Sequence, residues 1–425
     1  TFLVTINTEA HEKMTVKFDS DLKPINAGSV REFKEFAYAA NTADTEDSAF
    51  IIDSEEALIE FARIASTFYP RTAAKVVADL DMSEIDWTPI EGFGAFEFDG
   101  GSAEGYTING LKAPLFGTTN ATIKNLTLTG VNITETEAAF TGSIARVLNG
   151  GELNNCSAQG TLLVNNTTLS IAKPQDQYAE IAHGGLVGWA VGATIYNCEG
   201  DVDVTVTSLG AANKAKASAG GVVGAIANLC KMNNVTNNGD VLYNGTTNAA
   251  AMYLGGVVGK SSYSTPSLAE FSNITNNGNV STAKDSKTDA DLLLAGVAGD
   301  IVMESAAVVC DKLTNNGDIT HNGYSNGARL AGVGAYTCTG SFTNCKNTGD
   351  LTITTGARHT SGYMGGVFGQ TVYPKTMNNI VNEGAITIQD AAKEELTFKH
   401  GYVQMYGIAY GVSVRAGDDI PTVTN

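Results

Sequence analysis

Apolar and polar residues alternate in short runs along most of this chain, as in GDVDVTVTS (200–208) and GDLTITTG (349–356). This period of two is typical of β-strands, whereas an amphipathic helix repeats its apolar residues every three or four positions. Val, Ile and Thr are frequent in the runs, and Asn and Gly lie between them, which favours strands joined by tight corners. The pattern predicts an all-β protein.

Two short motifs recur in alternation. The first is a pair of glycines with apolar neighbours, such as GGVVG, and its copies begin at residues 184, 220, 255, 295, 331 and 365. The second, such as MNNVTNNG, has its third residue at 125, 155, 197, 234, 273, 312, 344 and 379. An internal repeat of a few tens of residues indicates a solenoid, a propeller or an array.

One position of the second motif separates these architectures. The residue that follows the third position is aliphatic or cysteine in every copy: Leu126, Cys156, Cys198, Val235, Ile274, Leu313, Cys345 and Ile380. One such position per repeat predicts a column of inward-pointing side chains, which a β-solenoid provides by stacking parallel strands about 4.8 Å apart. A propeller blade would need four antiparallel strands, and each repeat holds only about three short runs.

We therefore expect a right-handed parallel β-helix, a β-solenoid of about eight coils, with the hand taken from the general rule for parallel crossovers. The paired glycines are interpreted as places where the backbone turns or approaches the next coil too closely for a side chain. Residues 106–425 are assigned to this solenoid.

The segment before the repeats is predicted to close one end of the solenoid. Residues 53–68 form the best amphipathic helix of the chain, with Asp53 and Glu56 as a capping box, and we interpret this helix as an N-terminal cap. Residues 51–105 are assigned to this capping helix and the lead-in to the first coil. Residues 1–50 are predicted to form a short β segment, either a hairpin or the remnant of a preceding β-domain.

Charge and hydropathy exclude some partners. The net charge is −19, and residues 1–105 carry 21 acidic against 8 basic side chains. Such a surface repels nucleic acid and anionic lipid. No stretch approaches the roughly 20 apolar residues of a transmembrane helix. The chain begins at Thr1 without a leader, so we expect a removed signal peptide, with a lipid anchor left open.

The repeats resemble the GLUG motif, here as GGLVG (184–188), GGVVG (220–224 and 255–259) and GGVFG (365–369). Residues 52–128 resemble the lead-in often found before such repeats. The resemblance implies a secreted or lipid-anchored surface protein of a gut-dwelling Gram-negative bacterium, with an adhesin-like role. It therefore implies an extracellular or outer-surface location, and it supplies no catalytic residues.

Candidate chemistry is sparse. The chain contains no GxSxG, GxxxxGK[ST] or HExxH motif. Asp240, Asn279, Asp318 and Asp350 follow the glycine of the second motif. Stacked one coil apart, their oxygens would form a ladder that could hold Ca²⁺; the alternative is that each bonds its own turn. No other cofactor is expected.

Two further sets of residues complete the expectations. Five tyrosines in or beside the variable segments could stack on sugar rings: Tyr178, Tyr243, Tyr253, Tyr324 and Tyr363. The six cysteines are interpreted as buried free thiols, with a Cys338–Cys345 disulfide as the alternative. We hence predict a non-enzymatic, monomeric, adhesin-like protein that presents a rigid face to a glycan or a host protein. The alternative is a carbohydrate-active β-helix enzyme, a polysaccharide lyase or glycoside hydrolase.

Overall fold

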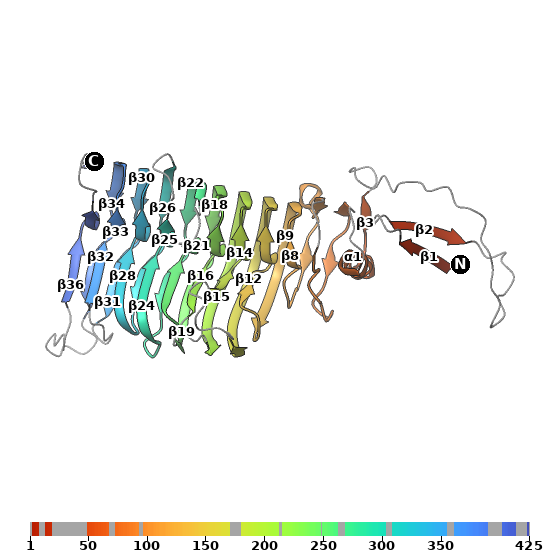
Figure 1. Ribbon diagram of the computed structural model, residues 1–425, viewed down its shortest axis with the longest axis horizontal. Coiled ribbons are helices and arrows are strands. Elements are labelled where there is room, and N and C mark those ends of the chain that lie inside the picture. The colour runs from red at the N-terminus through yellow and green to blue at the C-terminus, as the bar shows by residue number, and fades with distance from the viewer. Residues whose placement is uncertain are drawn as a thin grey trace.

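The computed structural model confirms a nearly all-β solenoid. It describes residues 2–7, 13–18, 49–67, 73–92, 97–170, 180–211, 215–247, 249–261, 268–302, 308–354, 361–389, 402–413 and 423–424. Figure 1 shows strands stacked side by side along the long axis of the molecule, with helix α1 (Glu55–Thr67) at one end of the stack. Strands of the stack form a 27-stranded and a nine-stranded sheet, and every pair within them is parallel.

Each coil begins with a strand that carries the Asn motif and continues past a corner. The strands that begin the coils are β9 (Thr122–Glu135), β12 (Glu152–Ser170), β15 (Thr194–Ala211), β18 (Cys230–Asn237), β22 (Leu268–Asn276), β26 (Val309–Asn315), β30 (Ser341–Asn347) and β34 (Thr376–Asn382). From the fourth of these coils on, the run past the corner is a separate strand: β19 (Val241–Thr247), β23 (Val280–Thr282), β27 (Ile319–His321), β31 (Leu351–Thr354) and β35 (Ile386–Gln389).

The chain then returns through two strands that flank the paired glycines. The strands before the glycines are β10 (Phe140–Thr141), β13 (Glu180–Gly184), β16 (Lys216–Gly220), β20 (Ala251–Gly255), β24 (Lys287–Ala295), β28 (Tyr324–Ala331), β32 (Ser361–Gly365) and β36 (Tyr402–Tyr406). The strands after them make the nine-stranded sheet: β8 (Phe116–Thr119), β11 (Ala145–Asn149), β14 (Val187–Val191), β17 (Val223–Ala227), β21 (Val258–Ser261), β25 (Ala298–Val302), β29 (Gly334–Cys338), β33 (Phe368–Val372) and β37 (Ala409–Ser413).

The remaining elements lie near the two ends of the chain. They are β1 (Phe2–Asn7), β2 (Lys13–Phe18), β3 (Phe50–Ile52), α1 (Glu55–Thr67), β4 (Ala74–Val76), β5 (Leu80–Asp81), β6 (Glu97–Asp99), the 3₁₀ turn η2 (Ser102–Glu104), β7 (Ile108–Asn109) and β38 (Val423–Thr424). Strands β1 and β2 pair antiparallel as a separate two-stranded sheet, as a hairpin within residues 1–50 predicts.

The predicted column of inward-pointing residues is present. The eight residues of the column, from Leu126 to Ile380, are all buried. Register links them directly, for example through the pairs Val235–Ile274 and Cys345–Ile380. The main hydrophobic cluster runs without a break from Ile52 to Ile380, so the lead-in and the repeats share one core. All six cysteines are free thiols, and only Cys338 is not fully buried.

Polar side chains stack at the corners in the same way. The third residue of the motif has a left-handed φ between 49° and 55° in all eight copies, a conformation that Asn tolerates better than other residues with a side chain. Further along each corner, an Asn column runs through the buried Asn237, Asn276, Asn315 and Asn347 to the half-buried Asn382, and each Nδ2 donates to the Oδ1 of the next Asn at 2.7–2.8 Å. Each of these amides also donates to its own corner glycine carbonyl.

The paired glycines are explained by close approach, as expected. A Cβ at Gly221 would lie 2.2 Å from the carbonyl oxygen of Gly256 in the next coil and 2.3 Å from Asn237 Oδ1. Real Cβ atoms do not come that close, so the repeated glycine lets the carbonyl of one coil lie against the backbone of the next.

Helix α1 caps this end of the solenoid, as predicted, and packs on strands that precede the first Asn-motif coil. Its own residues Leu58, Phe61 and Ala65 are buried, and the Phe61 ring lies 6.0 Å from that of Phe98 on β6. The expected capping box is not what begins the helix, because it is the Ser54 hydroxyl that accepts the Ala57 N–H, at 3.3 Å. The N-cap is therefore one residue later than predicted.

The buried and exposed Asn residues of one corner provide a matched stability test. Asn315→Ala should lower the free energy of unfolding by about 2 kcal/mol or more, because the backbone and amide partners of a buried side chain lose their hydrogen bonds. Asn316→Ala removes only exposed ladder bonds, to Asn277 and from Thr348, and should cost less than about 1 kcal/mol. Urea denaturation followed by circular dichroism measures both; equal losses would contradict a structural role for the buried column.

Candidate functional site

The solenoid widens abruptly between two successive coils. In the first of them, the backbone bonds Asn132–Leu111 and Leu115–Ser143 place Leu111 and Leu115 opposite residues 132 and 143 of the next coil. Residues 111–115 therefore connect in five residues two points that residues 132–143 of the next coil connect by a longer path. Because of this step, the wider coil has no full coil next to it on the side that faces the N-terminus.

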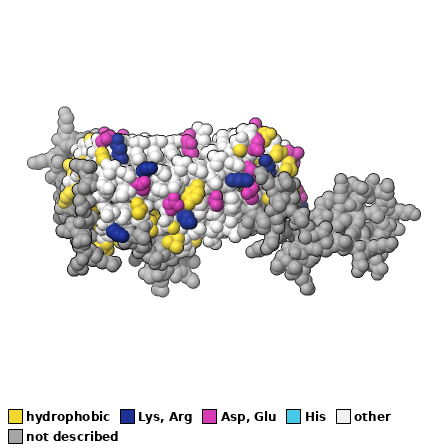
Figure 2. Space-filling model, turned by 90° about the horizontal axis from the view of Figure 1, so that it is seen from above, with side chains coloured by type: hydrophobic (Ala, Val, Ile, Leu, Met, Phe, Trp, Pro, Cys, Tyr) yellow, Lys and Arg dark blue, Asp and Glu magenta, His cyan; other side chains and the backbone are white. Residues whose placement is uncertain are grey.

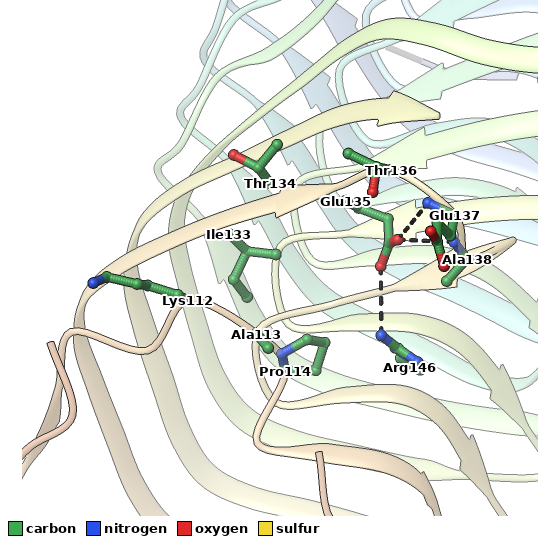
Figure 3. Close-up of a pocket in the computed structure, with 10 residues that line it drawn as sticks. All are labelled: Lys112, Ala113, Pro114, Ile133, Thr134, Glu135, Thr136, Glu137, Ala138 and Arg146. Atoms are coloured by element: carbon green, nitrogen blue, oxygen red, sulfur yellow. Dashed lines mark hydrogen bonds and ion pairs between the residues drawn. The ribbon is translucent and has the colours of Figure 1, made fainter. Parts of the chain in front are cut away.

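A pocket of about 410 Å³ lies at this step. Figure 3 shows it between residues 112–114, which cross beneath, and the end of β9 with the turn that follows. Its lining residues are Lys112, Ala113, Pro114, Ile133, Thr134, Glu135, Thr136, Glu137, Ala138 and Arg146. It therefore combines an apolar floor with two cationic and two acidic side chains.

Glu135 is a buried carboxylate with a full set of partners. Its Oε1 accepts the backbone N–H groups of Glu137 and Ala138 at 2.9 and 2.8 Å, and its Oε2 accepts the Thr141 hydroxyl at 2.8 Å. Burial acts to raise the pKa of Glu135, but these hydrogen bonds and the charge of Arg146 together lower it. Glu135 is therefore ionised at neutral pH and fixes the turn at the pocket.

Arg146 is less completely partnered. One of its terminal nitrogens lies 3.7 Å from Glu135 Oε2, an ion pair beyond hydrogen-bond distance, and its side chain is 34% exposed. Its Nε is buried and donates to no acceptor among the described residues. The buried Nε is out of reach of a partner, so only the exposed part of the Arg146 side chain can contact one in the pocket.

His183 lies in the register position directly above Thr141. It is fully buried, burial lowers its pKa to about 4 against the opposing effect of the Glu135 charge, and neither ring nitrogen has a hydrogen-bond partner among the described residues. His183 is therefore a neutral core residue at physiological pH.

The predicted oxygen ladder forms, but its oxygens are used within the fold. Asp240 Oδ1 accepts the backbone N–H of Asn279, Asn279 Oδ1 that of Asp318, and Asp318 Oδ1 that of Asp350, at 2.7–3.0 Å. The described residues contain no group of three or more His, Cys, Asp or Glu side chains that could hold a metal ion. These contacts link neighbouring coils, and calcium binding stays a prediction.

Of the four predicted tyrosines that lie within the described residues, two are buried. Tyr243 is buried and donates its hydroxyl to the Lys287 carbonyl at 2.8 Å, so its ring cannot stack on a sugar. Tyr253 is also buried. Tyr324 and Tyr363 are half-buried on β28 and β32, and sugar binding by them stays a prediction. Tyr178 lies outside the described residues.

Tyr253 belongs instead to a buried charged cluster that the sequence did not reveal. The ammonium of Lys260 lies 5.7 Å from the Tyr253 ring centroid and 2.5 Å from Glu180 Oε1, two coils away. Lys260 is only 1% exposed. Because removal of one partner would leave a buried charge, this pair helps to fix the register of three coils.

One protein-family sequence model matches the chain at the pocket. Residues 95–160 match the M26 IgA1-specific Metallo-endopeptidase N-terminal region. The match runs from just before β6 into β12 and includes Lys112, Glu135 and Arg146. It covers well under half of the 425 residues, so it describes a region of the chain rather than the whole.

Two solved structures resemble the chain at low identity. A crystal structure described as that of a candidate immunoglobulin A1 protease from Bacteroides ovatus is 17% identical, with a TM-score of 0.45, and the alignment covers 67% of this chain and 78% of that one. A structure named IgA1 Protease is 17% identical, with a TM-score of 0.41 and coverage of 80% and 22%. With TM-scores below 0.5, neither resemblance says more about this chain. No curated protein matches.

The family match corrects the predicted function. The prediction of a non-enzymatic adhesin-like protein is wrong, and so is its alternative, a carbohydrate-active enzyme. The family model that matches is described as the N-terminal region of an IgA1-specific metallo-endopeptidase. The match is to the M26 region, so it gives no support to the finer resemblance to GLUG-motif proteins.

The residues described do not suit the metal that the family description implies. His183 has no carboxylate free to join it, since Glu135 is already engaged. His321, on the separate strand β27, has Nδ1 2.9 Å from the Thr282 hydroxyl and Nε2 3.3 Å from that of Ser325. We therefore derive no metal-dependent step from these residues.

The pocket residues escaped the sequence analysis because they do not repeat. Glu135 occupies a register position that holds Val164, Val206 and Tyr243 in the following coils. A carboxylate at an otherwise apolar or aromatic position of the repeat was the available signal. It lies next to the degenerate first copy of the glycine motif, TGSIA (141–145), where the repeat is hardest to align.

Glu135→Gln should destabilise the fold by about 1–3 kcal/mol at pH 7, since a bonded buried carboxylate is replaced by a poorer acceptor. Because the pKa of Glu135 is lowered in the folded state, its ionised form stabilises the fold above the ordinary glutamate value of about 4.3, and this is lost as pH falls through the folded-state pKa. The stabilities of wild type and variant, measured by urea denaturation, should therefore approach each other as the pH is lowered below about 4.3.

Glu137→Gln is the matched control for this change. Glu137 lines the same pocket but its side chain is exposed, so its replacement should leave stability within about 0.5 kcal/mol. A pH-independent loss for Glu135→Gln would show that its charge is not what stabilises the turn.

Proposed function

We propose that this solenoid is the substrate-binding region of a protein of the IgA1-specific metallo-endopeptidase type. The observation that carries the proposal is the match of residues 95–160 to the N-terminal region of that family. The same residues build the step in the solenoid and line its pocket, so the family resemblance and the pocket fall on one segment.

The proposal assigns binding and orientation of the immunoglobulin substrate to this chain. A stack of coils in register is a rigid support, and a site built on strands holds its groups more precisely than one built on loops. Figure 2 shows one face of the solenoid on which uncharged polar surface predominates and charged side chains are scattered. Such a face suits a protein partner better than a polyanion.

The location follows from the proposed substrate. Immunoglobulins are extracellular proteins, so a protein that binds them acts outside the cell. Among the described residues, no helix is long and apolar enough to cross a membrane.

Binding to immunoglobulin tests the proposal. The full chain, immobilised on a biosensor, should bind immunoglobulin A1 with a dissociation constant on the order of micromolar or tighter, as expected for a specific protein interface. Immunoglobulin G at the same concentrations is the control, because it shares the immunoglobulin domains. Indistinguishable signals from the two proteins would contradict the proposal.

A further inference from the structure

The step in the solenoid leaves part of β9 without a partner on one side. On its upper side, which faces the next coil, β9 pairs with β12 as far as Glu135. On its lower side, which faces the preceding segment of the chain, the described strands pair with β9 only as far as Thr129. The last backbone contact on this side is the Asn132 N–H, which donates to the Leu111 carbonyl. Beyond Asn132, no described strand lies along the lower edge of β9.

Thr134 presents its backbone to this open edge. In a strand, the N–H and C=O of successive residues point alternately to the two sides. Since the Asn132 N–H points to the lower side, the N–H and C=O of Thr134, two residues on, do so as well. The residue is exposed and lines the pocket. An unpaired strand edge of this kind is a template for a further strand.

The pocket supplies what such a strand would need beyond backbone pairing. Pro114, Ile133 and Ala138 line it and offer contacts to one or two side chains. Arg146 also lines the pocket, its side chain is 34% exposed, and its ion pair with Glu135 is 3.7 Å long, beyond hydrogen-bond distance. A guanidinium can only donate, so a group that binds its exposed part must be an acceptor, and a carboxylate matches the geometry of the guanidinium best.

We propose that the open edge of β9 binds an extended peptide segment as an added strand, with an acidic side chain of that peptide on Arg146. This rests on the proposed function in so far as the peptide belongs to the protein substrate. The contacts are those of β-strand addition: main-chain hydrogen bonds hold the segment, and the pocket selects one side chain.

Selection of peptides on the full chain tests this directly. A random dodecapeptide display library is panned on the wild-type chain, and the enriched peptides are synthesised and measured by fluorescence polarisation. Enriched peptides should share one Asp or Glu, and its change to Asn or Gln should weaken binding about tenfold or more, the effect of losing a charge-assisted hydrogen bond.

Two substitutions in the chain separate the backbone contact from the side-chain contact. Thr134→Pro removes the N–H that faces the open edge and should weaken binding about tenfold, whereas Thr134→Ala keeps the N–H and should bind within about twofold of wild type. Arg146→Lys keeps the charge near Glu135 but lacks the planar guanidinium fork that pairs with a carboxylate, and it should weaken binding about tenfold. Thermal unfolding of each variant checks the fold, and Arg146→Lys alone decides the question if Thr134→Pro does not fold.

The outcomes distinguish this inference from the proposed function. Enrichment without a shared acidic residue, no enrichment at all, or binding unchanged in both Thr134→Pro and Arg146→Lys overturns the peptide site. If immunoglobulin A1 binds wild type and these variants equally, the proposed function stands and the peptide site falls. If acidic peptides bind through Thr134 and Arg146 while immunoglobulin A1 does not bind, the peptide site stands and the proposed substrate falls.

Discussion

Parallel pairing of each strand with its counterpart in the next coil is the constraint on which this structure depends. It places equivalent residues about 4.8 Å apart, so whatever surrounds a side chain in one coil surrounds its equivalent in the next. Because Val235 is apolar, its register partner Ile274 must be apolar as well. Because Asn276 has a buried amide, its neighbour Asn315 must be able to form a hydrogen bond with it. The sequence repeats because equivalent positions of successive coils must meet the same requirement.

The candidate site exists because the repetition fails at one point. Residues 111–115 take a shorter path than residues 132–143 above them, so one coil is narrower than the next. That difference exposes the end of β9, leaves Arg146 partly exposed in the pocket and places Glu135 where later coils have Val164 and Val206. This change in cross-section leaves the end of β9 without a described strand on one side, and an unpaired strand edge is a place where a partner strand can bind.

The sequence was sufficient for the parts of the fold that repeat. The column from Leu126 to Ile380, the close approach at Gly221 and the ladder from Asp240 to Asp350 all follow from residues that recur at fixed spacing. The pocket, the pair Lys260–Glu180 and the burial of Tyr243 did not follow, because each depends on a single coil or on contacts between coils. The sequence places Tyr243 beside a variable segment and so predicts a surface position, but the strand register places it next to Val206 in the core.

Distances along the stack test the central claim most directly. Ser157, Thr275, Thr314 and Val381 occupy one register column, which passes through Glu199, Thr236 and Lys346. Spin labels at Ser157 and at Thr275, Thr314 or Val381 are three, four and six coils apart. Pulsed electron paramagnetic resonance should give separations that grow by about 4.8 Å per coil. Separations that do not increase in proportion to the number of coils would show that the repeats are not stacked in register.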